Sequence, residues 1–138
     1  MYKKGFTLIE LLVVIAIIGL LSAVVIKYLS EAKFRGENAA IKTNLHSARS
    51  QMDLNYSTSN TYSGLCTSDP KLVTILQDAS LRGAGNTTSY ACNSNTLTWA
   101  ISTPLKISEG GNTYWCVDST GNAKSQAANL SSGVMQCL

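Results

Sequence analysis

The sequence has few of the side chains on which catalysis and metal binding depend. Its 138 residues include a single histidine, His46, and no serine or cysteine can be assigned to it as a nucleophile. Glu109 and Asp118 have no support as an acid–base pair. No two cysteines form a Cys-x-x-Cys pair, which leaves a tetrahedral zinc site poorly supported. We therefore expect a protein that is not an enzyme, with no catalytic residue, no metal ion and no cofactor.

Charged residues are scarce as well, at 14% of the chain, and the formal net charge is +3. Two of the positive charges, Lys3 and Lys4, stand within the first five residues. Without them 9 basic and 8 acidic residues remain, a net charge of +1. A nearly neutral chain has no basic face to attract phosphate groups. We expect no direct contact with nucleic acid.

Charge almost disappears within residues 6–26, where Glu10 is the single charged residue among 21. A helix of about 20 apolar residues is long enough to cross the core of a bilayer. Lys3 and Lys4 precede this run, and basic residues beside an apolar segment favour the cytoplasmic side, although basic residues also follow it. We expect one membrane span with its N-terminus inside.

Proline is missing from residues 27–55, so nothing there forces the helix to stop at the membrane. Ile41, Leu45, Ala48 and Met52 recur at spacings of four, three and four, which is one face of an amphipathic helix. We expect an unbroken helix of residues 6–55, about 75 Å long at 1.5 Å per residue. The polar residues after it are expected to end it.

The rest of the chain predicts a short helix followed by β-strands. Asp69 is a good N-cap with Pro70 at the first helical position, and Gly83 is well placed to end this helix. A loop is expected over residues 83–95. Runs of β-forming residues follow, separated by segments that contain Gly and Asn. We expect strands at 97–102, 113–118 and 123–126, and turns at 109–112 and 119–122.

Together these elements predict an α+β fold, with a long N-terminal helix packed on a small C-terminal antiparallel sheet. Trp99, Tyr114 and Trp115 are expected in its core or on its sheet. The first half of the helix is the part expected to span the membrane.

All cysteines lie in the C-terminal part: Cys66, Cys92, Cys116 and Cys137. An even number in a small exported domain indicates two disulfides, whereas the alternative is four thiols in a reducing compartment. Four cysteines allow three pairings, and the spacing alone does not choose among them.

The first residues carry a specific motif. Gly5 is followed by Phe-Thr-Leu-Ile-Glu-Leu, residues 6–11, and then by an apolar helix with Gly19. This segment resembles the class III signal sequence of type IV pilins and pseudopilins over residues 1 to about 26. The helix-then-sheet layout extends the likeness over the chain, but less specifically.

The resemblance implies a role for each matching residue. A membrane prepilin peptidase would cut between Gly5 and Phe6, with Lys3 and Lys4 keeping that bond at the cytoplasmic face. Phe6 would become the new N-terminus, usually N-methylated. Glu10 would neutralise the terminal ammonium of a neighbouring subunit. The chain would then divide into a cleaved leader (1–5), a membrane or filament-core half-helix (6–26), an amphipathic half-helix (27–56) and a disulfide-containing head (57–138).

The chemistry of Glu10 supports its role independently. A carboxylate inside a spanning helix is costly and is tolerated where it finds a partner. Once Lys3 and Lys4 are cut away, the amine on Phe6 is the cation at hand. The alternative is that Glu10 only reaches the membrane interface near its helix end.

Two further details follow from the resemblance. Pilins with a disulfide-closed C-terminal loop imply that Cys116 pairs with Cys137, which leaves Cys66 for Cys92. Many pilins also carry a proline eight residues after the glycine that matches Gly19, and this chain has Lys27 there. The helix melting associated with that proline is therefore in doubt for this chain.

The implied partners are copies of itself and related pilin subunits in a helical polymer, the prepilin peptidase, an inner-membrane platform with its assembly ATPase, and the membrane. The chain would reside in the cytoplasmic membrane before assembly and in an extracytoplasmic or cell-surface filament afterwards. The favoured function is a structural subunit of a type IV pilus-like filament. The alternative is a pseudopilin of a type II secretion or DNA-uptake system. An exported soluble protein with an ordinary signal peptide is weaker, because no good Ala-x-Ala-like site follows the apolar run.

Overall fold

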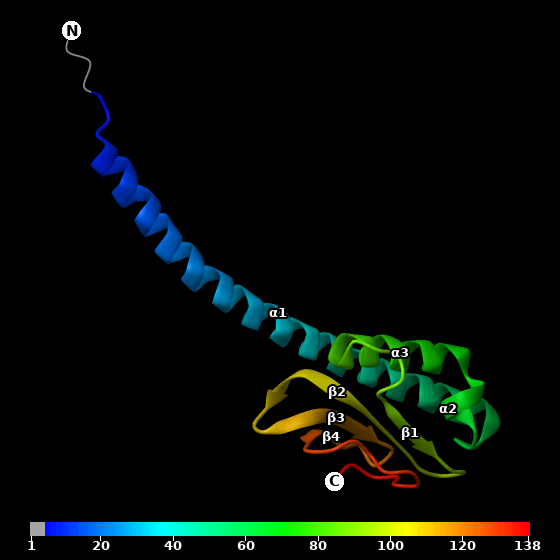
Figure 1. Ribbon diagram of the computed structural model, residues 1–138. Helices are drawn as coiled ribbons and strands as arrows, with labels where there is room; N and C mark the ends of the chain where they lie inside the picture. Colours follow the sequence, from blue (N-terminus) through cyan, green and yellow to red (C-terminus); the bar gives the residue numbers. More distant parts are fainter. Residues whose placement is uncertain (1–4) are drawn as a thin grey trace. The chain divides into compact units, whose positions relative to one another are not determined.

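The computed structural model describes residues 5–138, so Lys3 and Lys4 lie outside the described residues. The chain divides into two compact units, Met1–Lys33 and Phe34–Leu138, and a single helix, α1 (Leu8–Ser59), runs through both (Figure 1). Within the second unit α1 and α3 (Pro70–Ala84) cover one face of a four-stranded antiparallel sheet. This is the α+β arrangement that the sequence predicts.

The expected long helix is confirmed, with different ends. It begins at Leu8 instead of Phe6, because Thr7 is its N-cap. At its other end the polar residues 57–59 remain helical, and the hydroxyls of Ser57, Thr58 and Ser59 donate to carbonyls three or four residues earlier. The helix stops at Asn60, whose positive φ of 54° breaks the repeat.

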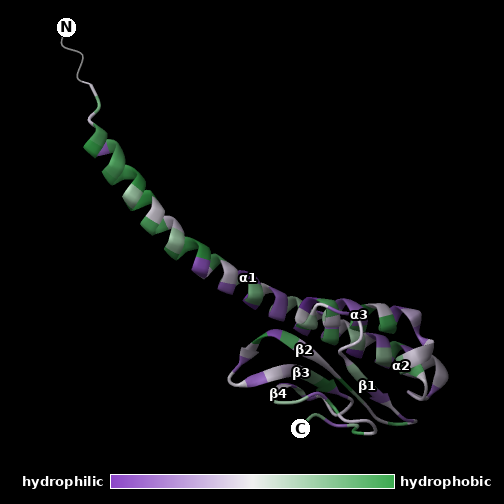
Figure 2. Cartoon of the chain, in the orientation of Figure 1, coloured by the Kyte–Doolittle hydropathy of each residue, from purple (hydrophilic) through white to green (hydrophobic). Residues whose placement is uncertain are grey.

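The expected apolar stripe of α1 is buried in the second unit. Ile41, Leu45, Ala48 and Met52 are fully buried against side chains of α3 and the sheet, including Leu72, Leu76, Trp99, Ile101 and Val117. Figure 2 shows the contrast along α1, which is mainly apolar in its first half and mixed in its second (Figure 2). The 3.6-residue period therefore predicted the core face of this helix correctly.

The helix α3 begins as expected and ends differently. The Asp69 carboxylate accepts from the backbone amides of Lys71 and Leu72, at 2.9 and 3.2 Å, and Pro70 follows at the first helical position. Gly83, however, does not end the helix. It lies inside α3 where a Cβ would stand 2.0 Å from the carbonyl oxygen of Pro104, while Gly85 supplies the left-handed cap with a φ of 78°.

The sheet has the order β1-β2-β3-β4, formed by Ala91–Ser94, Trp99–Glu109, Asn112–Asp118 and Ala123–Gln126. Strands are found where the last three are expected, but β2 starts at Trp99 and continues to Glu109, well beyond the expected end at residue 102. Both expected turns are confirmed, and Gly110 and Gly111 take the positive φ values that a tight hairpin needs. The expectation of a loop over residues 83–95 was wrong for β1. Its sequence, Ala-Cys-Asn-Ser, has weak β-propensity, and pairing with β2 outweighs it.

One buried side chain of α1 takes the place of a strand partner. The pairing of β2 with β3 shifts between Pro104 and Glu109, and Asn38 lies beside this irregular stretch. Its Oδ1 accepts from the backbone amide of Lys106 at 2.7 Å, and its Nδ2 donates to the carbonyl of Ile107 at 2.9 Å. The buried amide thereby satisfies backbone groups that the irregular pairing leaves without partners.

The opposite face of the sheet is covered by the C-terminal segment. Ala100, Cys116, Leu130 and Cys137 form a second buried cluster there. The structure contains the disulfides Cys66–Cys92 and Cys116–Cys137, the pairing that the resemblance implies. The second disulfide ties the end of the chain to β3, and the first ties the short helix α2 (Leu65–Ser68) to β1.

Candidate functional site: the N-terminal segment

Thr7 and Glu10 form a reciprocal cap at the start of α1. The Glu10 carboxylate accepts from the backbone amide of Thr7 at 2.9 Å and from its hydroxyl at 2.8 Å. The backbone amide of Glu10 donates in turn to the Thr7 hydroxyl at 3.3 Å. This Thr-x-x-Glu arrangement is a capping box, which satisfies amides that the first helical turn leaves free. The same Thr-x-x-Glu pattern can be read from the sequence, but the expectation for Glu10 was either a role between subunits or a place at the membrane interface, and no role as a cap.

The bond between Gly5 and Phe6 lies before the helix. Residues 5–7 are not helical, the Phe6 side chain is 75% exposed, and no heavy atom lies within 4 Å of where a Cβ on Gly5 would be. A protease needs an extended backbone that it can surround, and a helix would hide it. The cap at Thr7 therefore leaves this peptide bond accessible while it fixes the first turn behind it.

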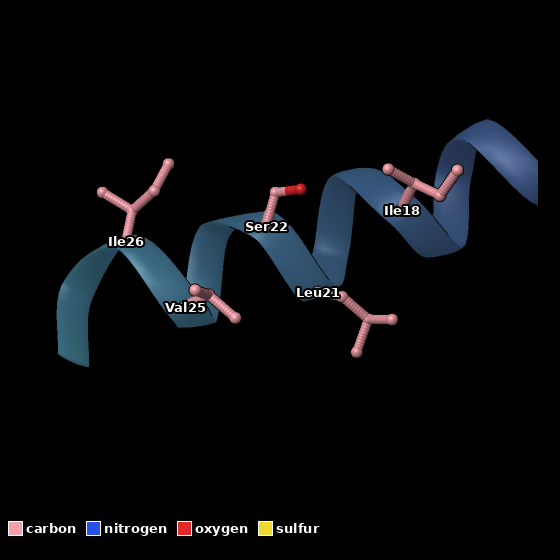
Figure 3. Close-up of a pocket in the computed structure, with 5 residues that line it drawn as sticks. All are labelled: Ile18, Leu21, Ser22, Val25 and Ile26. Atoms are coloured by element: carbon pink, nitrogen blue, oxygen red, sulfur yellow. The ribbon is translucent and has the colours of Figure 1, made fainter. Parts of the chain in front are cut away.

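The first half of α1 is the most apolar segment described. By length and composition it is a candidate membrane span, and none of its apolar window is buried within the chain. Figure 3 shows Ile18, Leu21, Ser22, Val25 and Ile26 on successive turns (Figure 3). Their side chains line a shallow apolar hollow with Ser22 as its polar member. In this half, apolar side chains lie open to a lipid or protein surrounding.

The helix continues through Gly19 and Lys27 without interruption. Gly19 lies in the helix without a positive φ, and apart from the helix's own backbone and its chain neighbours no heavy atom lies within 4 Å of where its Cβ would be. Lys27 keeps the backbone N–H that a proline would lack. The chain thus has an unbroken helix where many pilins have the glycine–proline pair.

The other residues singled out from the sequence lie in the second unit, residues 34–138. Trp99 is fully buried and Trp115 half-buried, and the Lys42 ammonium lies 4.3 Å from the Trp115 ring centroid. His46 is an exposed residue of α1. Glu109 pairs with Lys42 at 2.6 Å, and hydrogen bonding to this ammonium lowers the pKa of Glu109. Over residues 5–138 no group of three or more His, Cys, Asp or Glu side chains is arranged to hold a metal ion.

Asp118 is a buried carboxylate that accepts several hydrogen bonds, and the sequence did not predict this structural role. It accepts from the amide of Cys137 at 2.8 Å, the hydroxyl of Thr120 at 2.7 Å and the side chain of Asn122 at 2.9 Å. Burial by itself raises the pKa of Asp118, but these hydrogen bonds outweigh it and hold the pKa below its usual range. Arg49 of α1 donates to the carbonyls of Asp118 and Asn122, so the centre also contacts the helix.

Comparison with known proteins identifies the N-terminal segment. The family model described as the prokaryotic N-terminal methylation motif matches residues 1–26. That motif is the prepilin signal of type IV pilins and pseudopilins, a family of structural subunits. No curated protein and no solved structure matches the chain. Residues 1–26 therefore carry a prepilin signal, and the fold that follows is pilin-like.

Proposed function

We propose that this chain is the precursor of a structural subunit of a type IV pilus-like filament. The observation that carries the proposal is the combination of the prepilin signal with a capped apolar helix, none of whose apolar window is buried within the chain. Such a helix needs a bilayer before assembly and other copies of itself afterwards. The disulfide-bonded head fits an extracytoplasmic location, because disulfides form in oxidising compartments.

The proposed sequence of events starts at the cytoplasmic membrane, with the N-terminus inside. Prepilin peptidase removes the leader, residues 1–5, and Phe6 becomes the methylated N-terminus. Residues 6–26 span the membrane and later form the filament core, residues 27–56 form the amphipathic half of the helix, and residues 57–138 form the outer head. A membrane platform and an assembly ATPase lift each subunit into the growing filament.

Glu10 has two roles in this proposal, one before assembly and one after. In the single chain its carboxylate is satisfied by Thr7, which lowers the cost of placing it at the end of an apolar helix. In the filament the same carboxylate faces the ammonium on Phe6 of a neighbouring subunit, and this charge pair sets the axial position of the two helices. The capping hydrogen bonds and such an ammonium–carboxylate pair are both charge-assisted, so the Glu10 carboxylate can exchange one for the other on assembly.

A pseudopilin of a type II secretion or DNA-uptake system shares these features. Electron microscopy of sheared surface material separates the two. The pilus subunit predicts filaments that contain this chain, whereas a pseudopilin predicts none at ordinary expression together with loss of secretion or DNA uptake on deletion.

Gly5→Leu supplies the control for processing. Because nothing packs against Gly5, this variant should fold its head normally, remain uncut and yield no filaments. Normal filaments from uncut Gly5→Leu chains would contradict the proposed function.

A further inference from the structure

The two disulfides differ in their access to solvent. Cys116 and Cys137 are 0% and 5% exposed and lie with Leu130 and Ala100 under the C-terminal segment. Cys66 and Cys92 are only half-buried and both line an open groove. Thiol–disulfide exchange requires a thiolate to approach a sulfur along the S–S axis, so access decides which bond reacts. The fold therefore presents one disulfide and encloses the other.

The groove beside Cys66–Cys92 has a volume of about 520 Å³. One wall is α2, a second is the C-terminal segment, and the floor includes the edge strand β1. Its lining is mainly polar, with Thr67, Tyr90, Asn93, Asn129 and Ser132 among its residues. The C-terminal wall is held in place because Asn93 donates to the carbonyls of Ser131 and Val134, at 2.8 and 2.9 Å.

The strand β1 stands at the edge of the sheet. It pairs with β2 on one side, and within residues 5–138 no strand pairs with its other side. An exposed strand edge accepts an extended peptide through backbone hydrogen bonds. A partner segment that lies along β1 would bring its own side chains to the Cys66–Cys92 sulfurs.

We propose that Cys66–Cys92 is the site at which the dithiol of an extracytoplasmic thiol–disulfide oxidoreductase acts on the folded protein. A partner thiolate attacks one of the two sulfurs, forms a mixed disulfide, and releases the other cysteine as a thiolate. The second partner thiol, as its thiolate, then attacks the mixed disulfide. Two electrons and two protons pass from the partner dithiol to Cys66 and Cys92, and the partner becomes the disulfide. The reverse reaction closes the bond again.

The Cys66–Cys92 disulfide restrains the segment that joins α1 to α3. Between Asn60 and Asp69 this segment is anchored by the buried side chain of Leu65 and by the amide of Tyr62, which donates to the carbonyl of Thr96 at 3.3 Å. Cys66 and Cys92 pack against the main core without belonging to its buried residues, so opening the bond removes the covalent link to β1 and disturbs the core only at its edge. Exchange at this site therefore changes the mobility of one surface segment in an otherwise folded head.

The test compares the two disulfides in one molecule. The full chain in detergent micelles is exposed to dithiothreitol for graded times, acid-quenched, alkylated and peptide-mapped. Cys66 and Cys92 should become alkylated at least about tenfold faster than Cys116 and Cys137, since the buried pair must first open locally. In denaturant the two rates should approach each other. Equal rates in the folded chain, faster opening of Cys116–Cys137, or a ratio that persists in denaturant would each overturn the proposal.

Two further experiments test whether the groove gives access to the disulfide and whether a thiol–disulfide oxidoreductase reacts there. Ser132→Trp places a bulky side chain in the groove and should slow the reaction of Cys66–Cys92, whereas Gln136→Trp, on the same exposed segment outside the groove lining, should not. A thioredoxin whose resolving cysteine is replaced by serine should be trapped as a mixed disulfide at Cys66 or Cys92. Trapping at Cys116 or Cys137, no trapping at all, or equal rates for the two tryptophan variants would contradict the proposed site.

Discussion

The two halves of α1 differ in what surrounds them, although they form one helix. Residues 8–33 are exposed throughout, and none of their long apolar side chains is buried within the described residues. In residues 34–59 the apolar side chains alternate with polar ones, and the apolar stripe is buried. A uniformly apolar helix needs an apolar surrounding on every side, whereas an amphipathic one needs a partner on one side. The first half can therefore be buried only by lipid or by another protein chain, whereas the second half is buried by elements of its own chain.

The largest expected effect concerns Glu10, the single charged residue of residues 6–26. Glu10→Ala should still insert and be cut, but sheared filament yield should fall at least about tenfold, because the neighbour's ammonium loses its buried partner. Glu10→Gln is the matched variant, since glutamine keeps the capping box with Thr7 and loses the charge. We expect it to fail like Glu10→Ala when cleaved fraction and filament yield are measured side by side.

The two substitutions separate the cap from the charge pair. Normal filaments from Glu10→Gln would show that the cap suffices and that no charge pair forms. Normal filaments from Glu10→Ala would remove Glu10 from assembly and leave apolar helix packing as the sole driving force.

A second prediction applies the same substitution to each half of the helix. Leu45 is fully buried, so Leu45→Ala should lower the free energy of unfolding of the head by about 2–5 kcal/mol. Leu20 is 69% exposed, so Leu20→Ala should change it by less than about 0.5 kcal/mol. Denaturant unfolding in micelles, followed by tryptophan fluorescence, measures both. Comparable losses from the two variants would mean that the halves are not independent in stability.

The third and smallest effect concerns the buried carboxylate of Asp118, which holds the C-terminal segment and its own turn. Asp118→Asn should cost about 1.5–3 kcal/mol at neutral pH, because a charged acceptor of several hydrogen bonds is lost. The folded pKa of Asp118 is lowered, so the unfolded chain binds the proton more readily. The stabilisation is present above the unfolded pKa of about 3.9 and disappears as pH falls through the lower folded value.

Unfolding measured across that acidic range checks the assignment. The difference between the original chain and Asp118→Asn should shrink as the pH falls. A difference that stays constant down to strongly acidic pH would show that Asp118 contributes through shape and not through its charge.

Periodicity and capping chemistry predicted much of this molecule. The apolar stripe of α1, the Asp69 cap and the hairpins after β2 follow from local patterns, because each feature is fixed by residues close in sequence. Features fixed by distant contacts were missed. Gly83 was assigned to the helix end because its packing against Pro104 is not visible in the sequence, and β1 exists because β2 pairs with it.

The candidate site shows the same division. The motif from Gly5 to Glu10 was evident from the sequence, and the cysteine pairing came from the resemblance alone. The Thr7–Glu10 cap is a local Thr-x-x-Glu pattern, so the sequence alone contains its signal. The roles of Asn38 and Asp118 depend on backbone groups more distant in the sequence, which no local pattern indicates.

In the proposed function the mature subunit keeps residues 6–26, and only the leader, residues 1–5, is removed. Intact-mass measurement of the chain from membranes or sheared filaments tests this most directly. We expect a mass that lacks residues 1–5 and carries one additional methyl group on Phe6. A mature chain that begins beyond residue 26 would identify the apolar half as an ordinary signal peptide and contradict the account.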